Sequence, residues 1–196
     1  CVKWLNRELG ETQGRFLRQR FPESVDIIGM LSEFARRVRP QLRLIMPPTP
    51  PSIVLAASEV VGYAKTGGLA DVCGYLPGAL AAQGHKVSVI MPLYRAVRNG
   101  RRPIEPTSMV LYVPLSKGTY TARLWKGPLS GDVPIYFIEQ AEFFERDDPN
   151  KGTSLYQFTS DDGEKTDYPD NCLRYAFFSR AVLEAIHQLG LTADVL

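Results

Sequence analysis

Two short apolar runs that flank a helical pattern constrain the fold of this chain more than any other feature. Residues 53–57 read IVLAA and residues 87–91 read VSVIM, as is typical of strands buried on both faces of a parallel sheet. Between them, apolar residues recur with helical spacing and predict one face of a helix at Leu69, Val72, Cys73, Leu76 and Leu80. Because parallel strands need such a crossover, the sequence predicts an α/β fold.

The second half of the chain predicts further strands and a closing helix. Three β-rich runs lie at 109–115, 120–125 and 133–139, and the turn residues between them favour hairpins. Residues 147–170 are polar and predict a functional or mobile loop. A largely buried helix is expected over 172–189, with its core face at Tyr175, Phe178, Val182, Ile186 and Leu189.

The first 51 residues differ in character from the rest. Residues 1–46 are basic and contain an amphipathic stripe, which predicts a helical arm that either faces solvent or docks on the domain or on a partner. Four prolines within 47–51 predict an extended spacer. We therefore place the main domain at 52–196.

Composition argues against several functional classes. A net charge of +2 gives no broad field for nucleic acid, and no apolar run reaches the roughly 18 residues of a membrane span. The three cysteines are widely spaced and form no CxxC pair, so neither a disulfide framework nor a zinc site is expected.

The loop KTGGLAD at 65–71 carries the clearest chemical signal. Gly67 and Gly68 would let a ligand approach the backbone at a helix start, and Lys65 would add a charge, which together suit a phosphate. The loop matches neither GxGxxG nor GxxxxGK[ST], so a simple tight turn is the alternative. Asp71 lies in the first helical turn, where it also favours the helix dipole.

Two polar residues precede the closing helix. Asp170 and Asn171 have short side chains that can hydrogen-bond sugar hydroxyls, but both residue types are also preferred helix N-caps. Tyr156 and Tyr168 could stack on sugars, although lone tyrosines on polar loops more often pack locally.

Residues 53–97, which contain YAKTGGLADVCGYLPGAL, resemble the opening of bacterial glycogen synthases and plant starch synthases, glycosyltransferase family 5. The segments VPIYFIEQAEFFERD at 133–147 and DYPDNCLRYAFFSRAVLEAI at 167–186 resemble the same family in the same order. The resemblance covers roughly residues 52–195 and leaves the basic arm unexplained.

This resemblance implies the N-terminal half of a GT-B fold, a doubly wound domain with a mainly parallel sheet that holds the acceptor glucan. It implies transfer of glucose from ADP-glucose to α-1,4-glucan with retained anomeric configuration, and we therefore expect no metal and no cofactor. Lys65, Gly67 and Gly68 would line the donor diphosphate, and Asp71 would lie beside the transferred glucose as a catalytic residue. Asp170 and Asn171 would bind sugar hydroxyls.

The chain departs from the family at two places. Gly62 stands where the family commonly has proline, and the sequence stops at Leu196, before a family segment that contains HAHDW and before the C-terminal donor domain. The domain at 52–196 is therefore expected to be incomplete and inactive alone. A non-catalytic glucan-binding or assembly module and a GT-B enzyme that uses UDP-glucose are alternatives. The family implies the bacterial cytoplasm or, alternatively, the plastid stroma.

Overall fold

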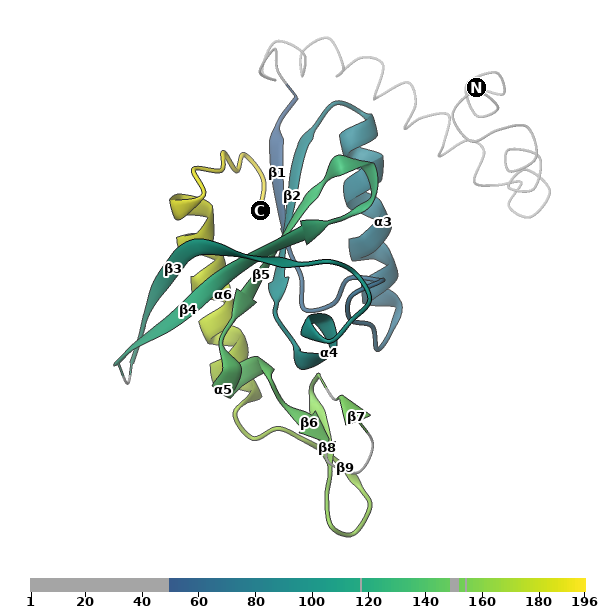
Figure 1. The fold of residues 1–196 in the computed structure, drawn as a ribbon, viewed down its shortest axis with the longest axis vertical. Helices are drawn as coiled ribbons and strands as arrows, with labels where there is room; N and C mark the ends of the chain where they lie inside the picture. Colours follow the sequence, from purple (N-terminus) through teal and green to yellow (C-terminus); the bar gives the residue numbers. More distant parts are fainter. Residues whose placement is uncertain (1–49, 117, 149–151, 154) are drawn as a thin grey trace, which may run out of the picture. The chain divides into compact units, whose positions relative to one another are not determined.

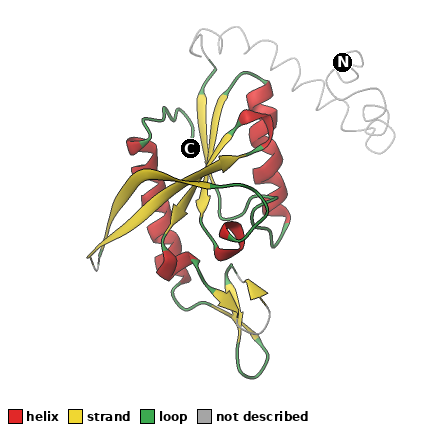
Figure 2. Cartoon of the chain, viewed as in Figure 1, coloured by secondary structure: helices red, strands yellow, loops and turns green. Residues whose placement is uncertain are grey.

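The computed structural model describes residues 50–116, 118–148, 152–153 and 155–196. The helical arm predicted at 1–46 lies outside the described residues, as does the spacer as far as residue 49. The main element is a five-stranded sheet with the order β1-β2-β5-β4-β3 (Figure 1). Helices and strands alternate along its first half, so the predicted α/β class is confirmed (Figure 2).

The parallel part of the sheet is the unit predicted from the two apolar runs. It consists of β1 (Ser52–Ala56), α3 (Gly68–Ala82) and β2 (Lys86–Pro92), with β1 and β2 paired in parallel. β5 (Pro134–Glu139) continues the parallel pairing beside β2. Val195 forms a parallel bridge with Ile53. All six apolar or small residues of β2 after its exposed first residue are buried, as a central strand requires.

An antiparallel hairpin completes the sheet. β3 (Glu105–Leu115) and β4 (Gly118–Pro128) form this hairpin, and β4 pairs antiparallel with β5. The three β-rich runs of the sequence are thus confirmed as strands. Short helical turns, α4 (Arg95–Arg98) and η1 (Ser130–Asp132), lie in the connections before β3 and after β4.

The helix α3 exists as predicted, but its predicted core face was only partly correct. Cys73 is buried and Leu80 is partly buried against the core, as predicted. Leu69, Val72 and Leu76 are 51%, 58% and 40% exposed, whereas the buried residues of the helix are Ala70, Cys73, Gly74 and Pro77. A Cβ added to Gly74 would lie 2.3 Å from Cγ1 of Val61. The helix therefore packs through its small residues because its backbone comes very close to the loop after β1.

The helix α6 (Asn171–Gln188) packs against β3 and β5, and Figure 1 shows it on the other side of the strands from α3. Phe178 and Val182 are buried as predicted, but Tyr175, Ile186 and Leu189 are only partly buried. Phe177 and the buried Arg174 were not in the predicted face. Rings from α5 (Ala141–Phe144) pack with Phe177, including Phe143 at a centroid distance of 5.1 Å.

The polar segment predicted as a loop at 147–170 contains short strands. β6 (Asp147–Asp148) pairs with β7 (Gly152–Thr153), and β8 (Gln157–Thr159) pairs with β9 (Lys165–Asp167). Both pairs are antiparallel and lie apart from the main sheet (Figure 1). In the described part of the chain, no helix combines the length and the apolar character needed to cross a bilayer.

Candidate functional site

The predicted phosphate-binding residues lie where the loop 57–67, which leaves the carboxyl end of β1, meets α3. Lys65 and Gly67 belong to the loop, and Gly68 is the first residue of the helix. Gly67 is the N-cap and has φ −150°, an extended conformation that any residue can adopt. No atom lies within 4 Å of a Cβ built on Gly67 or Gly68. The two glycines therefore do not make a left-handed turn, and their lack of side chains leaves open space in front of the helix start.

Gly62 has a conformation that explains its departure from the family's proline. Its φ is +89°, which a proline ring cannot adopt, and a Cβ there would lie 2.6 Å from Arg102. Glycine is thus the residue that this backbone conformation requires.

A buried carboxylate holds the loop in place. Glu59 is 3% exposed and accepts hydrogen bonds from Thr66 N at 2.5 Å, Thr66 Oγ1 at 2.6 Å and Gly67 N at 3.2 Å. Burial acts to raise the pKa of Glu59, but the hydrogen bonds from Thr66, Tyr156 and Gly67 outweigh it and lower the pKa below its ordinary value. Glu59 is therefore a charged anchor for the loop backbone.

Tyr156 joins this anchor to the segment before α6. Its hydroxyl donates to Glu59 Oε1 at 2.7 Å and also lies 2.8 Å from Ser58 Oγ. Its carbonyl oxygen accepts from Asn171 Nδ2 at 2.8 Å. The structure thus connects the loop after β1 with the predicted Asp170–Asn171 pair through one tyrosine.

Lys65 and Asp71 face each other at the start of α3. Lys65 Nζ lies 2.6 Å and 2.7 Å from the two carboxylate oxygens of Asp71. The two side chains are 48% and 44% exposed, so solvent screens the pair and it contributes about 0 to 1 kcal/mol. Both groups can therefore exchange this contact for a ligand at little energetic cost.

Asp170 does not cap α6 with its side chain. Its carboxylate instead forms a two-pronged ion pair with Arg146, at 2.7 Å and 2.5 Å. Burial acts to raise the pKa of Asp170, but the hydrogen bonds and charge of Arg146 outweigh it and lower the pKa. The alternative prediction, that the Asp170 side chain caps α6, is therefore wrong.

Asn171 is held by both ends of its amide. Besides the bond to Tyr156, its Oδ1 accepts from Arg174 Nη1 at 2.7 Å. Arg174 is fully buried, and it also donates to the carbonyls of Phe143 and Leu155, at 2.6 Å and 3.1 Å. This arginine fixes three separate segments around the start of α6.

Sequence reasoning missed Glu59, Arg146 and Arg174. All three lie within the segments that resemble the family, but none of them was singled out as a site residue. One signal was available for Glu59, a carboxylate within the apolar and small residues around 53–64. The structure links Lys65 to Asp71 directly, and links their loop to Asn171 through Glu59 and Tyr156. No hydrogen bond or ion pair in the described residues joins Lys65 to Asp170.

Comparison with known proteins gives a consistent result. Residues 52–196 match the family model described as the starch synthase catalytic domain. The chain is 45% identical over 145 residues to a glycogen synthase of Syntrophotalea carbinolica and 40% identical over 154 residues to that of Rhodopirellula baltica. Each match covers 74% of this chain and 28% of the relative. The chain thus spans just over a quarter of the length of these curated relatives.

A solved structure agrees with the sequence matches. The chain is similar to the catalytic domain of starch synthase IV from Arabidopsis thaliana bound to ADP and acarbose, with a TM-score of 0.59 and 29% identity. The similarity covers 72% of this chain and 26% of that one. Because the family model matches most of the sequence, the chain belongs to the family of starch synthase catalytic domains.

Proposed function

We propose that this chain is part of the N-terminal, acceptor-side domain of a retaining glucosyltransferase that elongates α-1,4-glucan from ADP-glucose. The observation that carries the proposal is the arrangement at the start of α3, where open space at Gly67 and Gly68 lies beside the exposed Lys65–Asp71 pair. The relatives are named glycogen synthases, and the similar starch synthase is bound to ADP. These names support a nucleotide-sugar donor and a glucan acceptor.

The donor diphosphate is proposed to bind at this open helix start. The N–H groups of Gly68 and Leu69 have no hydrogen-bond acceptor among the described residues, and a helix N-terminus favours negative charge. When the bond between glucose and phosphate breaks, negative charge develops on the departing ADP. Lys65 supplies a cation from this half of the protein, and its release from Asp71 costs little because the pair is solvent-exposed.

The sugar is proposed to contact Asp71, Asp170 and Asn171. Release of Lys65 frees the Asp71 carboxylate to face the transferred glucose. A carboxylate has about four acceptor positions, and Arg146 uses two of those on Asp170. Asn171 keeps one amide hydrogen and one lone pair beyond its bonds to Tyr156 and Arg174. Each of the three residues thus retains hydrogen-bonding capacity for a hydroxyl.

The proposal includes a C-terminal donor domain as partner and needs no metal or cofactor. One cation is too little to stabilise a departing diphosphate, and electrostatic stabilisation is usually the largest catalytic effect. We therefore expect the 196-residue chain alone to transfer no glucose from ADP-glucose to glycogen. Measurable transfer by this chain alone would contradict the proposal that a C-terminal donor domain is needed.

Steady-state kinetics of the full-length protein test the site. Lys65→Ala should raise the KM for ADP-glucose by about ten- to a hundredfold, as expected for loss of a charged hydrogen bond. Asp71→Asn should lower kcat more than it raises KM. Lys126→Ala is the matched control, because Lys126 is also exposed and pairs with a carboxylate, that of Glu105.

The outcomes separate the alternatives. Wild-type kinetics for both Lys65→Ala and Asp71→Asn would show that the loop is structural only. Faster transfer from UDP-glucose than from ADP-glucose would contradict the proposed donor. Glucan binding without transfer from either donor, in the full-length protein, would favour a non-catalytic binding module.

A further inference from the structure

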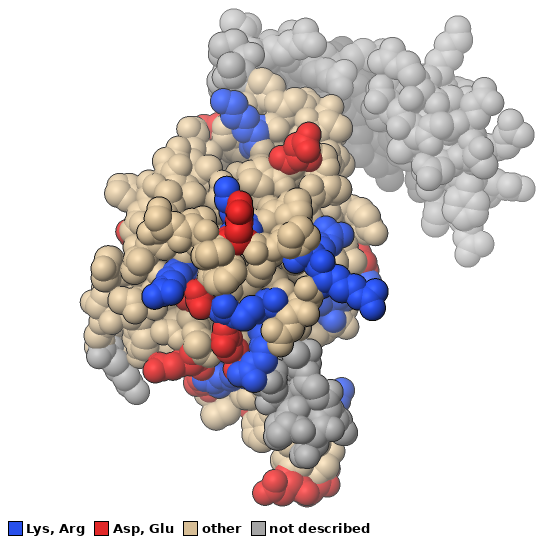
Figure 3. Space-filling view, viewed as in Figure 1, with Lys and Arg blue, Asp and Glu red and all other residues tan. Residues whose placement is uncertain are grey.

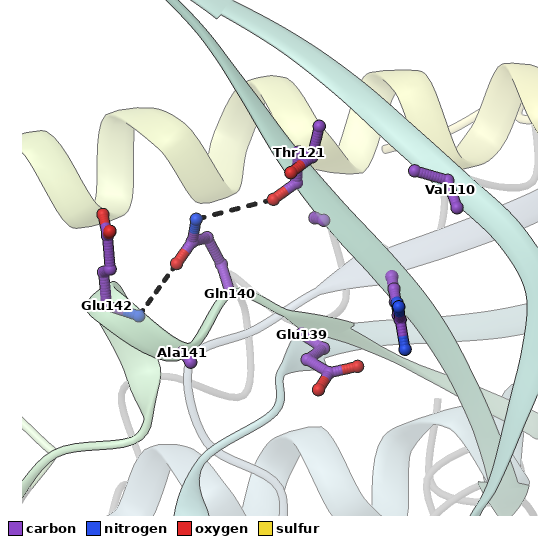
Figure 4. Close-up of a pocket in the computed structure, with 8 residues that line it drawn as sticks. Val110, Thr121, Glu139, Gln140, Ala141 and Glu142 are labelled. Atoms are coloured by element: carbon purple, nitrogen blue, oxygen red, sulfur yellow. Dashed lines mark hydrogen bonds between the residues drawn. The ribbon is translucent and has the colours of Figure 1, made fainter.

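A groove beside the β3–β4 hairpin takes no part in the proposed transfer site. It has a volume of about 450 Å³ and is lined by residues of β3, β4, the end of β5 and α5. Figure 4 shows Thr121 with Val110 on one side and with Gln140, Ala141 and Glu142 on the other. The volume lies within the range of about 300 to 1,000 Å³ that is usual for small-ligand sites.

Figure 3 shows basic and acidic side chains interspersed on one face of the described residues, and the polar groups of the groove are likewise mixed in charge. Several of these groups are held in place. Glu139 accepts from Trp125 Nε1 and from Arg98 Nη2, both at 2.6 Å, and the Gln140 side chain accepts from Glu142 N at 2.9 Å. Arg123 is exposed, and no ion pair of the described residues involves it. Because Arg98 already pairs with Glu139, the other charged residues of the lining are one carboxylate, Glu142, and one arginine, Arg123. The lining therefore has no excess of positive charge for a phosphate, whereas donors and acceptors together suit a neutral polyhydroxyl ligand.

An exposed aromatic ring lies next to the groove. Tyr112 is 60% exposed and stands opposite Thr121 in the β3–β4 register, two residues along β3 from Val110. Directly opposed side chains on one sheet face lie about 5 Å apart at Cβ. Leu111 and Val113, which alternate with these residues, are buried on the other face. Tyr112 therefore offers a flat ring beside hydrogen-bonding groups, a combination that suits the C–H face and hydroxyls of a pyranose.

We propose that this groove, together with Tyr112, binds two or three glucose units of an α-1,4-glucan chain outside the transfer site. The identity of the sugar polymer rests on the proposed function. Glu139 is the last residue of β5, and Gln140 follows it. Glu59 follows the carboxyl end of the parallel β1, so both sites open at the same edge of the sheet. A long polymer held at the groove would stay attached to the protein between transfers.

The test is a titration of the 196-residue chain with maltoheptaose, in which binding is measured by calorimetry and by amide chemical shifts in NMR spectra. We expect millimolar binding that shifts the amides of Thr121, Gln140 and Glu142. Tyr112→Ala and Arg123→Ala should each weaken this binding about five- to tenfold. Tyr75→Ala, at an exposed tyrosine on α3, is the matched control and should bind as the wild type does.

Several results would overturn the proposal. These are wild-type affinity for both Tyr112→Ala and Arg123→Ala, shifts confined to residues 57–71, and equal affinity for the β-1,4-linked cellohexaose. Thermal unfolding checks that the variants remain folded, and both substituted residues are exposed. Because Lys65→Ala and Asp71→Asn do not touch the groove, their kinetics can fail while maltoheptaose still binds, and that result would refute the proposed function alone.

Discussion

Replacement of the buried Glu59 by glutamine tests whether a charged anchor fixes the loop that carries the site. The carboxylate accepts four hydrogen bonds, from Thr66 N, Thr66 Oγ1, Gly67 N and the Tyr156 hydroxyl. Glutamine keeps the shape but removes the charge and one of the two acceptor oxygens. Hydrogen bonds to charged groups contribute about 1.5 to 3 kcal/mol and neutral ones about 0.5 to 1.5 kcal/mol.

The expected loss follows from this count. The two bonds that the remaining oxygen can still accept become neutral, and each weakens by about 1 kcal/mol. The two hydroxyls can turn to accept from the new amide, and Tyr156 also contacts Ser58, so their loss is partial. We expect Glu59→Gln to lower the free energy of unfolding by about 2 to 3 kcal/mol at pH 7.

The pH dependence separates charge from shape. The folded-state pKa of Glu59 is lowered from its ordinary value of 4.5. The stabilisation is therefore complete above about pH 4.5 and is lost as the pH falls through the lowered folded-state value. Below that value wild type and Glu59→Gln should approach equal stability.

Urea unfolding followed by circular dichroism, at pH 7 and again near pH 3, measures both quantities. The control is Glu164→Gln, the same chemical change at an exposed residue of the β8–β9 hairpin, which should leave stability within about 0.5 kcal/mol of wild type. Equal stability of Glu59→Gln and wild type at pH 7 would refute the role of Glu59 as an anchor of the loop. A difference that persisted unchanged at low pH would refute the role of charge.

Two further predictions concern the glycines and the buried arginine. A Cβ added at Gly68 would have no atom within 4 Å. Gly68→Ala should therefore keep the wild-type melting temperature while raising the KM for ADP-glucose. The control Gly74→Ala should lower the free energy of unfolding by about 1 to 3 kcal/mol, because the added methyl group would clash with Val61. A lowered melting temperature of Gly68→Ala would contradict the open space at Gly68. Arg174→Met should lower unfolding free energy by about 3 to 5 kcal/mol in urea titrations, since three acceptors lose their donor. Arg180→Met on the exposed face of α6 should have little effect, and equal effects of the two would show that the buried hydrogen bonds contribute nothing.

The elements of the fold could be predicted from the sequence because their signals are local. Short apolar runs and turn residues predicted β1, β2 and the three later strands, and helical spacing predicted α3 and α6. The loop at 65–68 was also recognisable, because its lysine and glycines are adjacent in the chain. The predicted roles of the site residues, Lys65 to Asn171, stay predictions that the kinetic experiments test.

Tertiary structure decided how these elements meet. The apolar stripe of α3 predicted only part of its buried face. Cys73 is buried, but the close approach to Val61 requires the small residue Gly74, and Leu69 and Val72 are exposed. The partners of Glu59 and Asn171 could not be read from local pattern, because Tyr156 lies 97 residues after Glu59. Periodicity reports which residues are apolar along one element, whereas burial and hydrogen bonding depend on which distant segments the fold brings beside it.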